Sequence, residues 1–268
     1  NIRLAIRNIL KNKVNSIITV GGLTVAFACI LLIYIYVSQE FSYNNFHSNK
    51  DKIFRANYSY ALENGTEGKS LLFDSKLSEI IKEKVPQVKK CTAFRSAHGP
   101  TLMFENNNFE EKICIAESDF FDMFSFKLVI GNKEKLFENP DEIVISSSLA
   151  NKFQAINTCT REELMGQHVF FQNTGDQPFV ISGIMENVPK NSSFQFDALI
   201  PYRYEAAFSQ SNNTFGNSSI LYEINQKEDA LQAELQINQT ITEHYKELVA
   251  QLQNENILAN TANCFMPF

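Results

Sequence analysis

Hydrophobic residues are concentrated in one long run near the start of the chain. Residues 14–39 carry no charged side chain, and residues 16–37 read SIITVGGLTVAFACILLIYIYV. A helix of this core is about 33 Å long, enough to cross the hydrocarbon layer of a bilayer. The run is preceded by four basic residues and no acidic one, namely Arg3, Arg7, Lys11 and Lys13. The pattern predicts a transmembrane helix over residues 14–39 with a cytoplasmic N-terminus.

The alternative for this run is a cleaved signal peptide. Such a peptide has an apolar core of about 7–15 residues, followed by a cleavage site of small residues. The run here is longer and ends in Ile-Tyr-Val-Ser-Gln-Glu-Phe, so a retained helix is favoured. Gly22, Ala26 and Cys29 form a short stripe of small residues. Such a stripe lets another helix dock closely, but a stripe this short also arises by chance, and both alternatives remain open.

The residues before the run combine basic and aliphatic side chains. Residues 1–13 are predicted to form a cytoplasmic amphipathic elbow along the inner face of the membrane, and the alternative is a simple charged anchor. The sequence begins at Asn1 rather than Met, so we expect a fragment or a processed product.

Periodic patterns beyond residue 40 predict two similar units. Residues 53–62 alternate like a strand, residues 74–85 have helical spacing before Pro86, and residues 88–95 again indicate a strand. A second set consists of a strand at 220–224, a long helix at 227–253 and a last strand at 264–266. These patterns predict strand–helix–strand units at about 53–95 and 220–268.

The region between these units is built of shorter elements. Strands are expected at 101–104 and 112–116. Residues 117–177 are interpreted as an inserted lobe, in which Ser118 and Asp119 cap a short aromatic turn and residues 146–153 form a short helix. Further expected strands in this region are 143–145, 169–171, 179–185 and 198–202. The predicted fold class is α+β.

Charge and composition exclude one class of partner. The 268 residues are 44% hydrophobic, and residues 14–268 hold 20 basic and 30 acidic side chains. An acidic domain argues against nucleic acid as a partner, because phosphate binding requires a basic face.

Candidate catalytic motifs are weak. Residues 65–70 read GTEGKS and resemble a P-loop, but a P-loop needs four residues between its glycines and here there are two, so we interpret a polar turn. The four histidines are scattered and are interpreted as surface or loop residues: His47, His98, His168 and His244. Ser146 to Ser148 lack a nucleophile motif. We predict no catalytic residue, no cofactor and no metal site.

The cysteines contain no CxxC pair, which argues against a zinc site. Four lie beyond the apolar run: Cys91, Cys114, Cys159 and Cys264. Cys91 and Cys114 are expected on strands that are able to pair, so a disulfide is an open alternative. We favour free thiols, because no spacing rule selects this pair.

Several ordered motifs then resemble one known family. Phe46-His47 with residues 51–55 (DKIFR) is similar to the start of the MacB-like periplasmic core domain. The more specific stretches are residues 119–131 (DFFDMFSFKLVIG), 139–153 (NPDEIVISSSLANKF) and 179–197 (FVISGIMENVPKNSSFQFD). The chain thus resembles the N-terminal part of an ABC-transporter permease of the MacB/FtsX-like family, although residues 154–165 are longer than the family pattern.

The resemblance implies a function and a set of partners. Residues 40–268 would form a periplasmic domain with a porter-like part and a Sabre-like lobe at about 117–177, anchored in the inner membrane. Three later transmembrane helices would be missing from this chain. ATP would be hydrolysed by a separate cytoplasmic ABC ATPase, so the chain itself would not be an enzyme. Further partners would be a second permease copy or permease half, the lipid bilayer and a periplasmic adaptor.

Under this resemblance, motion of the membrane helices would be relayed to the outer domain, which would export or hand over a drug, a peptide or a lipoprotein. The alternative function is a single-span membrane sensor with a periplasmic ligand-binding domain. The sequence after Phe268 discriminates the two, because a permease continues with three spans and a sensor continues with a signalling module.

Overall fold

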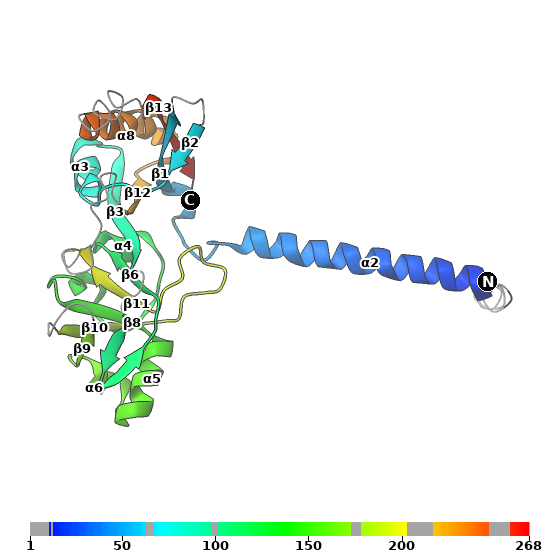
Figure 1. Ribbon diagram of the computed structural model, residues 1–268, viewed down its shortest axis with the longest axis horizontal. Coiled ribbons are helices and arrows are strands. Elements are labelled where there is room, and N and C mark those ends of the chain that lie inside the picture. The colour runs from blue at the N-terminus through cyan, green and yellow to red at the C-terminus, as the bar shows by residue number, and fades with distance from the viewer. Residues whose placement is uncertain are drawn as a thin grey trace. The chain divides into compact units, whose positions relative to one another are not determined.

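The computed structural model describes residues 11, 13–62, 67–97, 101–172, 178–202, 217–246 and 258–267. The chain forms two compact units. The first holds helix α2 (Lys13–Ser42) together with Asn191–Ser193, and the second holds Phe46–Lys190 and Phe194–Phe268 (Figure 1). Apart from Lys11 and Lys13, the expected elbow lies outside the described residues.

Helix α2 has the properties expected of a membrane span. It has 30 residues and is therefore about 45 Å long. The mean hydropathy of its most apolar 18-residue window is 2.4, and none of that window is buried. Inside the helix, the hydroxyl groups of Thr19 and Thr24 donate to the carbonyl oxygens of Asn15 and Val20 at 2.8 and 2.7 Å. These bonds leave neither hydroxyl hydrogen unsatisfied in an apolar surrounding. The helix extends past the predicted 14–39 at both ends.

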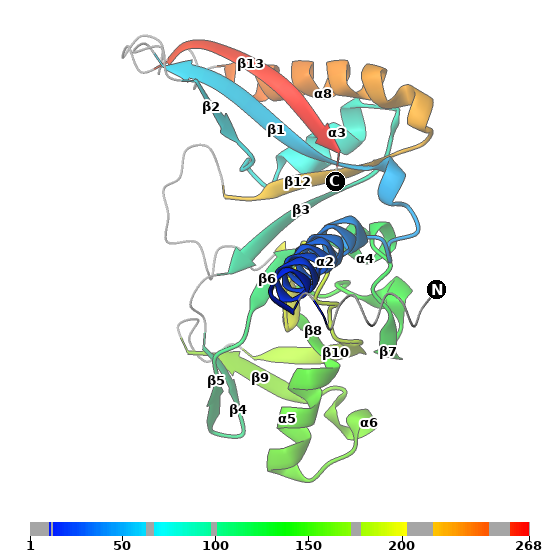
Figure 2. The ribbon, with the colours of Figure 1, turned by 90° about the vertical axis from the view of Figure 1, so that its right-hand side faces the viewer.

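The upper part of the second unit is an antiparallel sheet with two helices on one face (Figure 2). Its strands in spatial order are β13 (Leu258–Pro267), β1 (Ile53–Leu62), β12 (Ser219–Ile224) and β3 (Val88–Ala97). Helix α3 (Leu77–Lys84) connects β1 to β3, and helix α8 (Ala230–His244) follows β12 and precedes β13. The two predicted strand–helix–strand units are confirmed, and they interleave in one sheet as in a split βαβ fold.

The upper core lies between this sheet and its helices. Leu77 and Ile81 from α3 and Ile237 from α8 pack against Phe54 and Tyr222 from the strands, and all five are at most 7% exposed. Strand residues alternate between faces, whereas helix residues three and four apart share one face. The sequence therefore brings one apolar row from each element into the same layer.

Two elements of the upper part differ from expectation. Residues 67–70 form strand β2 (Glu67–Ser70), which pairs with β1, instead of belonging to a polar turn. Gly65 and Thr66 lie outside the described residues. The predicted helix 227–253 begins with the 3-10 turn η4 (Lys227–Asp229), and α8 ends at His244. Residues 247–257 are likewise outside the described residues.

The lobe between β3 and β12 is built of short strands and helices. Strand β6 (Ile113–Ala116) pairs with the far end of β3, so the sheet continues from the upper part into the lobe. The remaining strands are β4 (Leu102–Phe104), β5 (Asn107–Phe109), β7 (Leu128–Gly131), β8 (Glu142–Ser146), β9 (His168–Phe171), β10 (Phe179–Met185) and β11 (Ala198–Pro201). The helices are α4 (Asp119–Met123), α5 (Ser147–Asn157) and α6 (Arg161–Leu164), and the 3-10 turns are η1 (Lys50–Lys52) and η2 (Lys133–Lys135).

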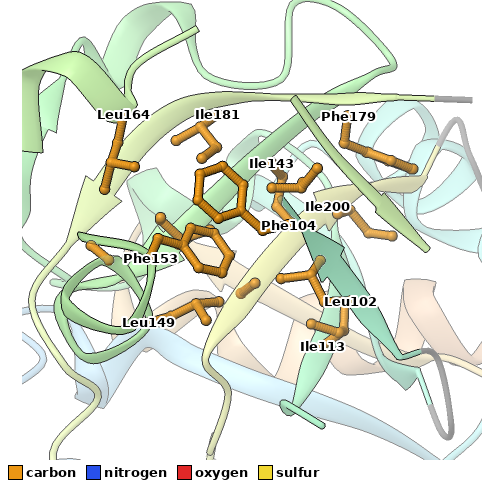
Figure 3. Close-up of a cluster of buried hydrophobic side chains, with 14 of the residues drawn as sticks. Leu102, Phe104, Ile113, Ile143, Leu149, Phe153, Leu164, Phe179, Ile181 and Ile200 are labelled. Carbon is orange, nitrogen blue, oxygen red and sulfur yellow. The ribbon is translucent and has the colours of Figure 1, made fainter. Parts of the chain in front are cut away.

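The lobe has a hydrophobic core of its own, which we call the lower core, and its side chains are almost completely buried. Phe153 from α5 stacks on Phe104 from β4 at a centroid distance of 4.3 Å, and Leu164 from α6 points toward them (Figure 3). The apolar side chains of this core come from residues 102–200. It therefore reaches beyond the interval 117–177 that the sequence indicated for the lobe.

Residues 154–165, which are longer than the family pattern, form the end of one helix and the whole of the next. Helix α5 continues to Asn157, and Thr158 ends it with a φ of 48°. Helix α6 then starts with a capping box, in which Thr160 and Glu163 bind each other's backbone N–H groups. Hydrogen bonds from the backbone N–H and the hydroxyl of Thr160 hold the pKa of the Glu163 carboxyl below its usual value. The pattern T-x-x-E was a readable signal for this helix.

The described cysteines are free thiols, as the sequence favoured. Cys91 lies opposite Tyr222 on β12, whereas Cys114 lies opposite Ser96 on β3. Five residues of strand separate Cys91 from Ser96, about 17 Å, which is far beyond the reach of a disulfide. Burial raises the pKa of the Cys114 thiol to about 12 and that of Cys91 well above its usual value. The side chain of Cys264 lies outside the described residues.

Candidate functional site at helix α4

The histidines are dispersed. His168 is exposed on β9, His244 Nε2 lies 3.9 Å from Asp74 Oδ2, and His98 is outside the described residues. His47 lies in a loop, as the sequence predicted, but it is only 2% exposed and is therefore buried. Among the described residues, no three His, Cys, Asp or Glu side chains are grouped to hold a metal ion. The predicted absence of catalytic chemistry stays a prediction.

Helix α4 occupies the junction between the upper part and the lobe (Figure 2). Its residues Phe120, Phe121 and Met123 are buried in a third cluster, which we call the middle core. The Phe120 ring stacks on Phe94 from β3 and on Phe126 at 5.3 and 5.6 Å. A five-residue helix has little stability of its own, so these ring contacts hold it. The expected cap is absent, because the Ser118 side chain makes no capping hydrogen bond.

Polar side chains tie the start of α4 to the upper part. Lys82 on α3 forms an ion pair with Asp119 at 2.5 Å, and Ser78 Oγ donates to Glu117 Oε1 at 2.7 Å. Asp119 is only 17% exposed, so solvent screens this pair less than it screens an open surface pair. Helix α3 is therefore linked to the start of α4 by an ion pair and by a hydrogen bond.

Glu117 has an unusual protonation equilibrium. Burial raises the pKa of its carboxyl from 4.5 to about 7, against the opposing effect of the hydrogen bond from Ser78. The nearby acids Glu79 and Asp119 raise it further. The carboxyl is therefore partly protonated near neutral pH.

The chain enters the second unit, which we also call the outer domain, through residues 46–52, which we call the linker. His47 Nδ1 accepts a hydrogen bond from the backbone N–H of Ser125 at 3.1 Å, and the N–H of Ser48 donates to Ser125 Oγ at 3.0 Å. The imidazole also contacts the rings of Phe124 and Phe126 edge-on at 5.0 and 5.2 Å. Burial lowers the pKa of His47 to about 4, so the ring stays neutral and keeps its acceptor at Nδ1.

The second half of the linker is bound to strand β12. Asn49 Nδ2 donates to Glu223 Oε1 at 3.2 Å, and Lys52 Nζ donates to the carbonyl oxygen of Asn225 at 3.1 Å. Glu223 is 2% exposed and also lies 3.5 Å from Lys89. The linker is thus held at two places, the segment after α4 and the end of β12.

In this arrangement the linker has hydrogen bonds to Ser125, just after α4, and to Glu223 of the upper sheet. Phe46-His47 with residues 51–55 and residues 119–131 are separate motifs in the sequence, and no local pattern predicted that they meet. The contact joins positions about 77 residues apart, and local sequence patterns do not report such separations.

Comparison with known proteins identifies the fold and the family. Residues 16–240 match the family described as MacB-like periplasmic core domain, which is 225 of 268 residues. No curated protein sequence gave a match.

Solved structures with a similar fold include a domain of a putative permease from Porphyromonas gingivalis. It is 21% identical with a TM-score of 0.64, and the match covers 83% of this chain and 92% of that one. The extracellular domain of the noncanonic ABC-type transporter YknZ from Gram-positive bacteria is 12% identical with a TM-score of 0.52, covering 72% and 95%.

The periplasmic region of MacB from Actinobacillus actinomycetemcomitans is 16% identical with a TM-score of 0.49, covering 74% and 86%. The family match spans most of the chain, from the apolar helix through the first strand–helix–strand unit and the lobe into α8. This chain belongs to the family of proteins with a MacB-like periplasmic core domain, the family of ABC-type transporter permeases.

Proposed function

We propose that this chain is part of the permease subunit of an ATP-driven transporter of the MacB/FtsX type. Helix α2 crosses the inner membrane with its N-terminus in the cytoplasm, and the domain that follows lies in the periplasm. ATP is hydrolysed by a separate cytoplasmic subunit. The outer domain uses the relayed motion to export or hand over a substrate such as a drug, a peptide or a lipoprotein.

One observation carries this proposal. An apolar helix of 30 residues is followed closely by a linker whose side chains and backbone are bound to Ser125, just after α4, and to β12. A ligand-binding domain that is merely tethered to a membrane does not need such bonds. A domain that is moved by its helix does need them, because a slack linker absorbs the displacement.

The test uses the full-length permease, purified from the membrane with whatever ATPase accompanies it. We expect an ABC ATPase subunit to copurify. Reversing Arg3, Arg7 and Lys11 to Glu is expected to weaken this association or to uncouple it, because these residues precede the span on the cytoplasmic side. The matched control reverses three exposed lysines of the outer domain, Lys76, Lys135 and Lys227, and is expected to leave the ATPase bound.

Two results contradict the proposal. One is a full-length protein that continues after Phe268 without further spans and carries a signalling module, which supports the sensor alternative. The other is a protein with further spans that binds no ATPase under conditions where its membrane insertion is intact.

A further inference from the structure

The C-terminal end of helix α2 is capped by a residue from a distant part of the sequence. The last four carbonyl groups of an α-helix have no partner within that helix. In α2, three of them accept hydrogen bonds from nearby groups, namely Ser42 Oγ, the Tyr43 N–H and Asn45 Nδ2. The fourth, that of Ser42, accepts from Asn191 Nδ2 at 2.8 Å as well as from the Asn45 N–H at 3.3 Å.

A second set of bonds joins the same two segments. The N–H of Asn44 donates to the carbonyl oxygen of Asn191 at 2.9 Å. Asn44 Nδ2 donates to Ser193 Oγ at 2.8 Å, and the N–H of Ser193 donates back to Asn44 Oδ1 at 3.0 Å. Asn44 has a φ of 57°, a left-handed conformation that asparagine adopts more readily than most residues. We call these four residues, Ser42, Asn44, Asn191 and Ser193, the clasp.

The clasp changes how the chain connects its two compact units. Asn191–Ser193 belong to the unit of α2, whereas Lys190 and Phe194 belong to the other unit. The backbone therefore passes between the units at three peptide bonds, 45–46, 190–191 and 193–194. A single covalent link transmits a pull but leaves rotation about its backbone dihedrals free. The two further links, at 190–191 and 193–194, restrict that rotation as long as residues 191–193 stay bound to the end of α2.

We infer that Asn44 and Asn191 are positioning residues that make α2 and residues 191–193 move as one piece, so that rotation and tilt of the helix reach the outer domain. This inference deepens the proposed function and rests on it. Without the clasp, the helix is connected to the domain at residues 45–46 alone, and only its translation is transmitted.

The experiment measures how much the two units move relative to each other in the full-length permease in lipid nanodiscs. Spin labels are attached at Ser38→Cys on α2 and Lys127→Cys in the outer domain, in a background whose native cysteines are replaced by alanine. The labelled protein is diluted with unlabelled permease, and pulsed dipolar spectroscopy gives the distance distribution between the labels. Both label sites are exposed and lie outside the clasp.

Two variants open the clasp by different routes. Asn191→Asp keeps the side-chain shape and removes the donor to Ser42, and Asn44→Gly removes the side chain while tolerating the positive φ. Each lost hydrogen bond is expected to raise the population of the open clasp about fivefold, which broadens the distance distribution. Lys190→Ala is the matched control, because it is exposed and adjacent to the clasp without taking part in it.

A distribution of unchanged width in both clasp variants, with thermal unfolding confirming that they are folded, overturns the inference. Broadening in Lys190→Ala to the same extent also overturns it. ATPase binding by the same samples separates this inference from the proposed function. If the clasp variants broaden the distance distribution but the permease binds no ATPase, the clasp is supported and the transporter function is contradicted. If the clasp variants leave the width unchanged and the permease binds an ATPase, the transporter function is supported and the clasp is contradicted.

Discussion

At the scale of single residues, two ionisable side chains near α4 behave differently because their surroundings differ. His47 lies among phenylalanine rings and stays neutral, which suits a permanent acceptor for the Ser125 N–H. Glu117 has its pKa near 7, because burial penalises its charge while hydrogen bonds partly support it. The first is therefore insensitive to pH in the neutral range, and the second is sensitive.

We expect Glu117→Gln to remove a pH dependence of stability. Because the folded pKa of about 7 lies above the usual 4.5, the folded state binds more protons than the unfolded state between these values. Stability due to this group is therefore fully present below about pH 4.5 and is lost as the pH rises toward 7. Above pH 7 the variant is expected to exceed the parent in unfolding free energy, on the order of 2 kcal/mol. Urea unfolding of the outer domain between pH 5 and pH 8 measures this.

Glu83→Gln on helix α3 is the control for that series. Glu83 is exposed on the same helix that carries Ser78. Parallel pH profiles for the parent and Glu117→Gln would show that Glu117 titrates normally in the folded protein.

At the scale of elements, short helices in this domain depend on the cores that they cover. Helix α5 places Phe153 in the lower core, where it stacks on Phe104 and meets Phe109 edge-on at 5.1 Å. Ile156 on the same helix is 39% exposed. One helix therefore offers both a core position and a matched surface position.

Phe153→Ala is expected to destabilise the outer domain by about 3–5 kcal/mol, because it removes buried ring contacts and leaves a cavity. Ile156→Ala is expected to cost no more than about 0.5 kcal/mol, since its side chain is partly exposed and lies outside the lower core. Denaturant unfolding of both variants measures the difference. Equal losses in the two variants would refute the packing assigned to α5.

At the scale of the whole molecule, charge is distributed unequally along the chain. Residues 1–13 carry four basic side chains and no acid, whereas the remainder has an excess of ten acids. Helix α2 is, in the described residues, the one helix long and apolar enough to span a membrane. This asymmetry motivates the orientation that we propose.

A reporter protein that is active only in the periplasm, fused after Asn64, is expected to be active. The four basic residues before the span oppose their own translocation, so the segment after it is exported. Fusion of the same reporter after Lys11 is the control and is expected to be inactive. Activity in the second fusion with silence in the first would reverse the topology.

Much of the fold was predictable, because the relevant signals are local. The helix that places Leu77 and Ile81 follows from apolar spacing and from Pro86, and strand β10 follows from a continuous apolar run. Strand β2 was missed, because its sequence EGKS is polar and glycine-containing, and pairing with β1 outweighs its weak strand propensity. The extra residues before Gly166 form an extension of α5 and the short helix α6, which was not predicted although its capping motif at Thr160 is visible in the sequence.

The sequence by itself determined the membrane span, the two strand–helix–strand units and the family, because periodicity, charge order and motif order are properties of the chain alone. Only the tertiary structure decided that His47 meets Ser125, that Asn49 binds Glu223 and that Asn191 caps α2. These contacts join residues from 78 to 174 positions apart. Such pairs are selected by the packing of the whole domain, and no local pattern of hydrophobic and polar residues encodes them.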